Sequence, residues 1–145
     1  MKVIAKNKKV EHDNEIIKKY EAGIVLTGAE IKSLRLQAPS LKGSFAYVRD
    51  SEIFLVNAHI PEYKFSSKYS LENSEPTRSR KLLLHKNEIR RINQIIKEQK
   101  LILLPLKIYW TSNSLVKVEI ALAKPLKKYD LREKLKAESI KRDKW

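Results

Sequence analysis

The sequence predicts a mainly β protein with helices (α+β), built as a small antiparallel OB-like β-barrel with two or three flanking helices and a basic C-terminal tail. Three observations support this fold class. One segment alternates apolar and polar residues, two pairs of segments look like hairpins, and two segments have helical spacing with recognisable starts. The 145 residues suffice for one hydrophobic core and leave no room for a second full domain.

The strands are predicted from alternation and turn residues. Leu115–Ala123 places an apolar side chain at every second position, which is the period of a half-buried strand. The apolar segment Leu101–Trp110 precedes it, and the turn-forming Thr111–Ser114 joins the two as a hairpin in which Pro105 marks an edge or a bend. A second hairpin is predicted from Phe45–Arg49 and Ile53–Ile60, and Ile16–Leu26 supplies another strand.

Two helices are predicted from start signals and spacing. Thr27 and Glu30 match a capping box, and Pro39 prevents the helix that they start from continuing further. The second helix covers about Lys86 to Glu98, where isoleucines recur on one face (Ile89, Ile92 and Ile96).

The remaining segments divide the chain. Residues 1–123 are predicted to form the barrel, interrupted by a polar connection of about twenty residues, Pro61–Arg80, long enough to suggest a functional or disordered loop. Residues 124–145 are predicted to form a basic tail that is disordered alone and helical on a partner, because their few large apolar side chains share no clean helical face.

The charge is uneven along the chain. The formal net charge is +14, yet residues 11–77 carry eight basic and ten acidic residues, so the excess lies elsewhere. Residues 1–10 carry four basic residues and no acidic one, residues 78–100 carry eight and two, and residues 124–145 carry nine and four. Clustered basic residues are typical of a surface that binds a polyanion, although charged runs are also often plain solvated surface.

Catalytic and cofactor motifs are missing from the sequence. There is no cysteine, which excludes disulfides, thiolate metal sites and a cysteine nucleophile, and the three glycines fit no nucleotide-binding loop. Asp50 and Glu52 are the nearest approach to a metal-dependent nuclease site, but they are more typical of a turn. We therefore expect no enzyme activity, no metal and no cofactor, a cytoplasmic location and no insertion into membranes.

Aromatic residues are interleaved with basic ones, as in proteins that stack unpaired bases. Most of these aromatic residues are predicted to be core or interface residues; the set is Tyr20, Tyr47, Tyr63, Tyr109, Tyr129 and Trp145. Tyr129, in Lys127-Lys128-Tyr129, has no predicted core to enter and is a candidate for RNA contact.

Several motifs together resemble one family. Glu21-Ala22-Gly23-Ile24, then Gly28–Arg35, Asn57–Ile60 and Arg78–His85 occur in order and at compatible spacing, followed by Pro105-Leu106, Lys117-Val118 and Ala123-Lys124. In these motifs the chain resembles the transfer-messenger RNA-binding proteins, also called small protein B or SsrA-binding proteins. The resemblance covers nearly the whole chain.

The resemblance implies an OB-like barrel that binds the tRNA-like domain of transfer-messenger RNA and delivers it to stalled bacterial ribosomes for trans-translation. The implied partners are that RNA and the ribosome, where the tail reads the 16S rRNA decoding centre and the vacant mRNA channel. Elongation factor Tu is implied only indirectly, through the RNA. The rival interpretations are a structural ribosomal protein or RNA chaperone, and a metal-dependent nuclease.

The resemblance also implies the contact residues. The RNA-binding positions fall on Asn7, Glu21, Leu83 and Lys117, although the residues alone favour a core leucine and an outward-facing strand lysine for the last two. The ribosome positions fall in the tail on Lys127, Lys128, Tyr129, Asp130 and Arg132. The tail departs from the family pattern at Pro125 and Leu131, which replace a glycine and a lysine and alter how the tail leaves the barrel.

Overall fold

The computed structural model describes residues 1–63 and 75–126. Along these residues the chain forms seven strands and three helices. In chain order they are β1 (Lys2–Lys6), α1 (Lys8–Asp13), β2 (Asn14–Ile24), α2 (Gly28–Leu36), β3 (Phe45–Arg49), β4 (Glu52–Val56), β5 (Arg80–Leu83), α3 (Lys86–Gln99), β6 (Ile102–Trp110) and β7 (Val116–Pro125).

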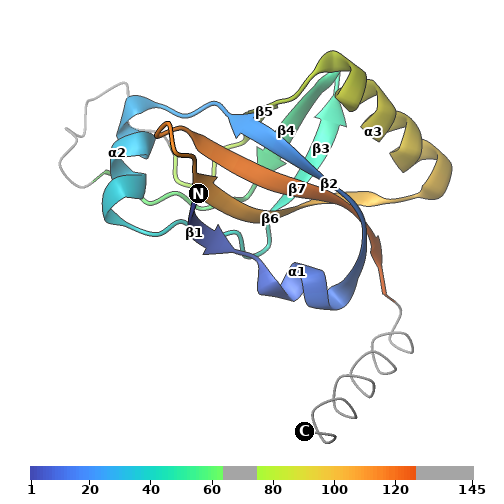
Figure 1. Cartoon of the computed structure of the whole chain (residues 1–145), viewed down its shortest axis with the longest axis horizontal. Helices are drawn as coiled ribbons and strands as arrows, with labels where there is room; N and C mark the ends of the chain where they lie inside the picture. Colours follow the sequence, from blue (N-terminus) through green and yellow to red (C-terminus); the bar gives the residue numbers. More distant parts are fainter. Residues whose placement is uncertain (64–74, 127–145) are drawn as a thin grey trace, which may run out of the picture.

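The strands form one antiparallel sheet that closes on itself. The hydrogen-bonded order is β1-β6-β3-β4-β5-β2-β7, and β7 also pairs with β6, so β2 to β7 complete a ring and β1 extends it alongside β6. Closure removes most of the free sheet edge. Figure 1 shows α2 and α3 at opposite ends of this ring and α1 below it. The predicted mainly β, OB-like barrel with flanking helices is therefore confirmed.

The interior of the barrel follows from the alternation in β7. Val118, Ile120 and Leu122 point inward and are fully buried, as the period of two requires. They pack against buried aliphatic side chains from the strands opposite and from α3, among them Ile53, Leu55, Leu82, Ile92 and Leu103. Burying a side chain of this kind contributes about 1.5 to 3 kcal/mol to the free energy of unfolding, so this core holds the ring together.

The predicted turns and caps are present. Asp50 and Ser51 join β3 to β4 with φ of 49° and 64°, the left-handed pair of a tight hairpin turn. Thr27 caps α2, since its hydroxyl accepts from the Glu30 N–H at 3.1 Å and its own N–H donates to Glu30 Oε1 at 3.0 Å. The register of β6 shifts between Pro105 and Lys107, which makes Pro105 a bend and not an edge, because β6 has neighbours on both sides.

Three elements have no counterpart in the sequence prediction. β1 and α1 contain five and six residues, too few for a clear period. β5 begins at Arg80, the last residue of the predicted loop, so only the middle of that loop, residues 64–74, lies outside the described part of the chain. At the other end β7 runs to Pro125, and Lys124 and Pro125 therefore lie in the sheet.

Candidate nucleic-acid interface

Three of the four predicted RNA contacts lie together on the outside of the barrel. Glu21, Leu83 and Lys117 come from β2, β5 and β7, and all three line one shallow depression of about 300 Å³. The depression forms because β2 pairs with β5 on one side and with β7 on the other, in a register that sets Gly23 opposite both Leu83 and Lys117. Residues nearly a hundred positions apart are brought to one surface in this way.

Gly23 shapes the floor of this depression. A Cβ at this position would lie 3.3 Å from the Leu83 Cβ, which is tighter than most Cβ contacts, and 3.5 Å from its Cδ1, which is an ordinary contact. Leu83 rests against the bare backbone of Gly23 and leaves half of its surface, 51%, exposed. The expectation that Leu83 is a core residue is therefore wrong, and an exposed leucine beside a charged pair is suited to packing on a base or a sugar.

An ion pair holds the polar side of the depression in place. The Lys117 Nζ donates to Glu21 Oε1 at 2.8 Å, and both side chains keep about a third or more of their surface exposed. The hydrogen bond from Lys117, together with one from the Tyr109 hydroxyl, lowers the pKa of Glu21 below its ordinary value. Burial, and next the bond to Glu21, raise the pKa of the Tyr109 phenol, so the phenol stays protonated and donates.

The charges continue across β6 and β7. Glu119 lies 3.9 Å from Lys107 and 4.0 Å from Lys19, and the Lys107 ammonium stands 5.7 Å from the centre of the Tyr109 ring. We call the surface formed by Lys19, Glu21, Leu83, Lys107, Tyr109, Lys117 and Glu119 the outer strip. It offers hydrogen-bond donors, acceptors and one apolar side chain in alternation, which is the chemistry of a surface that recognises folded RNA.

Asn7 lies at a different place on the molecule. Its Nδ2 donates to the Leu41 carbonyl at 3.2 Å and to the Pro105 carbonyl at 3.4 Å, and its backbone N–H donates to the Leu106 carbonyl at 2.8 Å. It lines a small hollow of about 120 Å³ together with Lys107 and Glu119, so this hollow adjoins the far end of the outer strip. The structure does not bring Asn7 into the depression of Glu21, Leu83 and Lys117.

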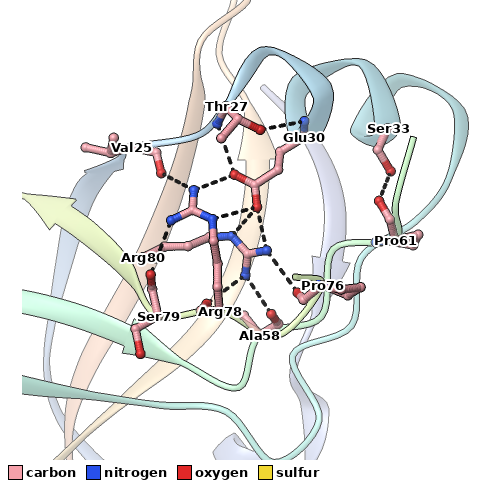
Figure 2. A network of polar contacts seen from close by, with 10 residues as sticks. All are labelled: Val25, Thr27, Glu30, Ser33, Ala58, Pro61, Pro76, Arg78, Ser79 and Arg80. Carbon is pink, nitrogen blue, oxygen red and sulfur yellow. Dashed lines mark hydrogen bonds and ion pairs between the residues drawn. The ribbon is translucent and has the colours of Figure 1, made fainter. Parts of the chain in front are cut away.

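The two arginines of the basic motif at residues 78–81 make contacts within the protein. Arg80 is completely buried and Glu30 is 5% exposed, and Arg80 Nε donates to Glu30 Oε2 at 2.7 Å. The remaining donors of Arg80 reach the carbonyls of Ala58, Pro76 and Arg78 at 2.8 to 3.2 Å, as Figure 2 shows. This network ties α2 to β5 and to the loop before it.

Arg78 completes the network from its edge. Its guanidinium forms two bonds with the Glu30 carboxylate and one with the Val25 carbonyl at 3.4 Å (Figure 2). Burial, the strongest influence, opposes ionisation of Glu30, but the bonds from Arg78, the Thr27 N–H and Arg80 outweigh it and lower the pKa of this carboxyl. Arg78 and Arg80 therefore serve the fold through their bonds to Glu30.

Gly23 lies in one of the family motifs, but neither it nor Lys107 nor Tyr109 was predicted from the sequence as a site residue. Tyr109 is 4% exposed, so the expectation that it is buried is correct, yet its hydroxyl also orients Glu21. Pro105 was the one local signal in the sequence at this point. The bulge that follows it changes which side chains of β6 face outward. The predicted ribosome contacts Lys127, Lys128, Tyr129, Asp130 and Arg132 lie outside the described residues.

Two properties of residues 1–63 and 75–126 bear on other functions. These residues hold no group of three or more histidine, aspartate or glutamate side chains placed to bind a metal ion. In the same residues, every helix is too short or too polar to cross a bilayer.

The fold and the outer strip define a small OB-like barrel protein with a charged surface on its strands. The model of the SmpB protein family matches residues 4–145, and the chain belongs to this family. The SsrA-binding protein of Thermosipho africanus (strain TCF52B) is 50% identical over 142 residues, which is 98% of this chain and 93% of that protein. That of Mycoplasmopsis pulmonis (strain UAB CTIP) is 48% identical over 137 residues, with 94% and 90% covered.

A solved structure gives the same result for the fold. A chain from a study described as "tmRNA-SmpB: a journey to the center of the bacterial ribosome" superposes with a TM-score of 0.69 at 41% identity. The match covers 89% of this chain and 92% of the other. The family predicted from the sequence motifs is therefore confirmed.

Proposed function

We propose that this chain binds the tRNA-like domain of transfer-messenger RNA and delivers it to stalled bacterial ribosomes for trans-translation. Membership of the SmpB family and relatives named SsrA-binding proteins support the RNA partner. The solved structure, whose description names tmRNA, SmpB and the bacterial ribosome, supports the second partner. The observation on this chain that carries the proposal is the convergence of Glu21, Leu83 and Lys117 in one exposed depression.

The chemistry of the four contact positions is complementary. Lys117 is placed to neutralise a phosphate, and Glu21 to accept a hydrogen bond from a base edge. Leu83 supplies an apolar contact beside them. The amide nitrogen of Asn7 already donates to two carbonyls, so its oxygen is the atom left to accept from a 2′-hydroxyl, the group that separates RNA from DNA.

The tail is the proposed ribosome-reading part. In this division the barrel, which extends through Pro125 at the end of β7, binds the RNA. The rest of the tail predicted for residues 124–145 is disordered alone and helical on the ribosome, where it reads the decoding centre of 16S rRNA and the mRNA channel. Lys127, Lys128, Tyr129, Asp130 and Arg132 are the contact residues of this proposal. Elongation factor Tu takes part through the RNA, and the protein works in the cytoplasm.

The protein acts as an adaptor and catalyses no reaction in this proposal. Recognition of a folded RNA requires complementary surface and charge, which the outer strip supplies, and needs no nucleophile or general base. The alternative function that predicts catalysis is a nuclease, which would cleave the bound RNA in the presence of a divalent metal.

A competition experiment tests the proposal. The intact protein is titrated with labelled tRNA-like domain at a fixed salt concentration, against unlabelled tRNA and ribosomal RNA fragments of the same length. We expect the tRNA-like domain to be preferred and to be recovered intact after incubation with Mg²⁺. Equal affinity for all three RNAs would favour a structural ribosomal protein or RNA chaperone, and metal-dependent shortening of the RNA would favour a nuclease.

A further inference from the structure

A depression of about 360 Å³ lies where the start of β1, the end of α2 and the end of β6 meet. We call it the Trp110 pocket. Its principal lining residues are Lys2 and Ile4 of β1, Leu34, Arg35 and Leu36 of α2, and Trp110 of β6. Its volume is within the range of about 300 to 1,000 Å³ that is usual for ligand sites. The pocket shares no residue with the outer strip and is a separate place on the surface.

The ends of three elements bring these side chains together. β1 pairs with β6 in a register that sets Lys2 opposite Trp110, the last residue of β6. α2 ends at Leu36, so Arg35 and Leu36 come to the pocket from its last turn. Leu36 is 57% exposed and Trp110 is only half-buried. An indole and a large aliphatic side chain are therefore left partly uncovered in one depression.

The pocket carries positive charge that the chain does not neutralise. Lys2 and Arg35 are exposed, and within the described residues no ion pair and no side-chain hydrogen bond engages either of them. None of the described residues that line the pocket is acidic. On the outer strip, by contrast, Lys117 is paired with Glu21 at 2.8 Å. The Trp110 pocket is therefore suited to an anion that comes from outside the chain.

The anion that fits this pocket has a flat apolar part as well as charge. A nucleotide has both, because its base stacks on an aromatic ring while its phosphates attract lysine and arginine. A free phosphate would engage the two cations and leave the indole and Leu36 uncovered, and a carboxylate side chain brings no flat surface to the indole. A nucleotide is thus the occupant that uses every group of the pocket.

β1 connects the pocket to the interface described above. The strand runs from Lys2 to Lys6 and leads directly to Asn7, which is about 16 Å from Lys2 at the usual rise of a strand. Residues 1–10 hold four basic residues and no acidic one. A polyanion that contacts Asn7 therefore meets a basic segment that leads to the Trp110 pocket, which favours a nucleotide of an RNA chain over a free nucleotide.

We propose that the Trp110 pocket binds an unpaired nucleotide of the RNA that the protein carries. The base stacks on the Trp110 indole, and the adjoining phosphates pair with Lys2 and Arg35. The inference rests on the proposed RNA-binding function and adds a second contact site to it, beside α2 and at the opposite end of the barrel from α3 (Figure 1). It also assigns a surface to the basic segment at residues 1–10.

Tryptophan fluorescence of the full-length protein tests the stacking. The chain contains two tryptophans, so Trp145→Phe leaves Trp110 as the only indole. This variant is titrated with the tRNA-like domain, and the bound fraction is measured separately from the anisotropy of a dye on the RNA. We expect the Trp110 emission to fall by about half or more in step with binding, because a stacked base quenches the indole. Free tryptophan at the same RNA concentrations corrects for light that the RNA absorbs.

Charge variants test the phosphate contacts without touching the core. Lys2→Gln combined with Arg35→Gln should make the slope of log affinity against log salt concentration shallower by about two units, one for each phosphate contact. Arg90→Gln combined with Lys97→Gln is the matched control, since it removes one arginine and one lysine that are exposed on α3. The control should leave the slope unchanged.

Binding of the RNA with no change in Trp110 emission would overturn the assignment of the pocket and leave the proposed function intact. An equal change of slope in the α3 control would also overturn it, because the two cations would then act only through net charge. Quenching by adenosine monophosphate without any quenching by the RNA would assign the pocket to a free nucleotide instead. Failure of the RNA to bind at all would overturn the proposed function and this inference together.

Discussion

Lys117 and Glu21 form a diagonal pair across β7 and β2. The strand partner of Lys117 is Gly23 and that of Glu21 is Glu119, yet the Lys117 Nζ reaches Glu21 Oε1 at 2.8 Å. Diagonal neighbours on a sheet are within reach of long side chains, and the missing side chain at Gly23 leaves this path open. The ammonium group is therefore oriented before any RNA is bound, which reduces the entropy that binding must fix.

Replacement of Lys117 by alanine should weaken binding of the tRNA-like domain and make its salt dependence shallower. One phosphate contact contributes about one unit to the slope of log affinity against log salt concentration. Titrations at four salt concentrations measure this slope. Lys97→Ala, an exposed lysine near the end of α3, is the matched control with the same charge change. An unchanged slope for Lys117→Ala would make Lys117 an ordinary surface lysine.

The pair should also be visible in the pH dependence of stability. Because the pKa of Glu21 is lowered, chiefly by the Lys117 hydrogen bond, the contribution of its carboxylate is complete above the ordinary glutamate pKa of 4.5 and is lost as the pH falls through the lower folded pKa. Urea unfolding of wild type and Glu21→Gln should differ by up to about 1 kcal/mol at pH 7, the limit for exposed pairs.

The difference between wild type and Glu21→Gln should disappear in strong acid. Glu75→Gln removes one exposed carboxylate outside the outer strip and controls for the change in net charge. A gap between wild type and Glu21→Gln that widens as the pH falls would contradict the sign of the pKa change.

Leu83 should separate stability from binding. The side chain is half exposed, so Leu83→Ala should change the free energy of unfolding by only about 0.5 kcal/mol, the range of surface substitutions. Its affinity for the tRNA-like domain should fall, because the apolar contact in the depression is lost. Leu82→Ala is the contrasting control, since Leu82 is buried and its loss should cost about 2 to 5 kcal/mol. Unimpaired RNA affinity of Leu83→Ala would remove Leu83 from the interface.

Local signals predicted the local parts of this fold. The alternation in Leu115–Ala123, the Thr27–Glu30 cap and the Asp50-Ser51 turn each depend on neighbours within a few residues, and each is present in the structure. The sequence analysis did not predict β5, because its first residue, Arg80, is of a type that usually lies in solvent. Its buried partner Glu30 lies fifty positions earlier, and no local pattern records that pairing.

For the site, too, the sequence predicted some of the residues but not how they are arranged in space. Glu21, Leu83 and Lys117 were predicted through the family motifs, while their meeting depends on the pairing of β2 with β5 and β7. Without the family resemblance, the residue type favoured a core position for Leu83, because a leucine flanked by leucines gives no sign of which one faces outward. The role of Tyr109 depends on a bulge and on contacts from two other strands, so it became visible only in the folded chain.

Arg80→Ala should destabilise the barrel strongly. It leaves the Glu30 carboxylate buried with one of its two arginines gone, and breaking a buried ion pair costs about 3 to 5 kcal/mol. Urea unfolding measures the loss. Arg78→Ala removes the partly exposed arginine and should cost less. A loss of under about 1 kcal/mol for Arg80→Ala would mean that the network contributes little to the fold.

Truncation after Lys128 should separate the two proposed activities. Affinity for transfer-messenger RNA should stay within about threefold of the intact protein, because the outer strip and Asn7 are retained. Tagging of peptides on ribosomes stalled at the end of a message should be lost, because most of the decoding-centre contacts are removed. Equal loss of RNA affinity and of tagging would contradict the division between barrel and tail.

The most direct test of the account is to identify the RNA that the protein binds in its native cell. The protein is cross-linked in place, recovered under denaturing conditions, and the attached RNA is sequenced for wild type and for Lys117→Ala at matched expression. The account predicts that the tRNA-like domain of transfer-messenger RNA is enriched over tRNA and ribosomal RNA, and that the substitution reduces this enrichment. Recovery of ribosomal RNA alone, unchanged by Lys117→Ala, would contradict it.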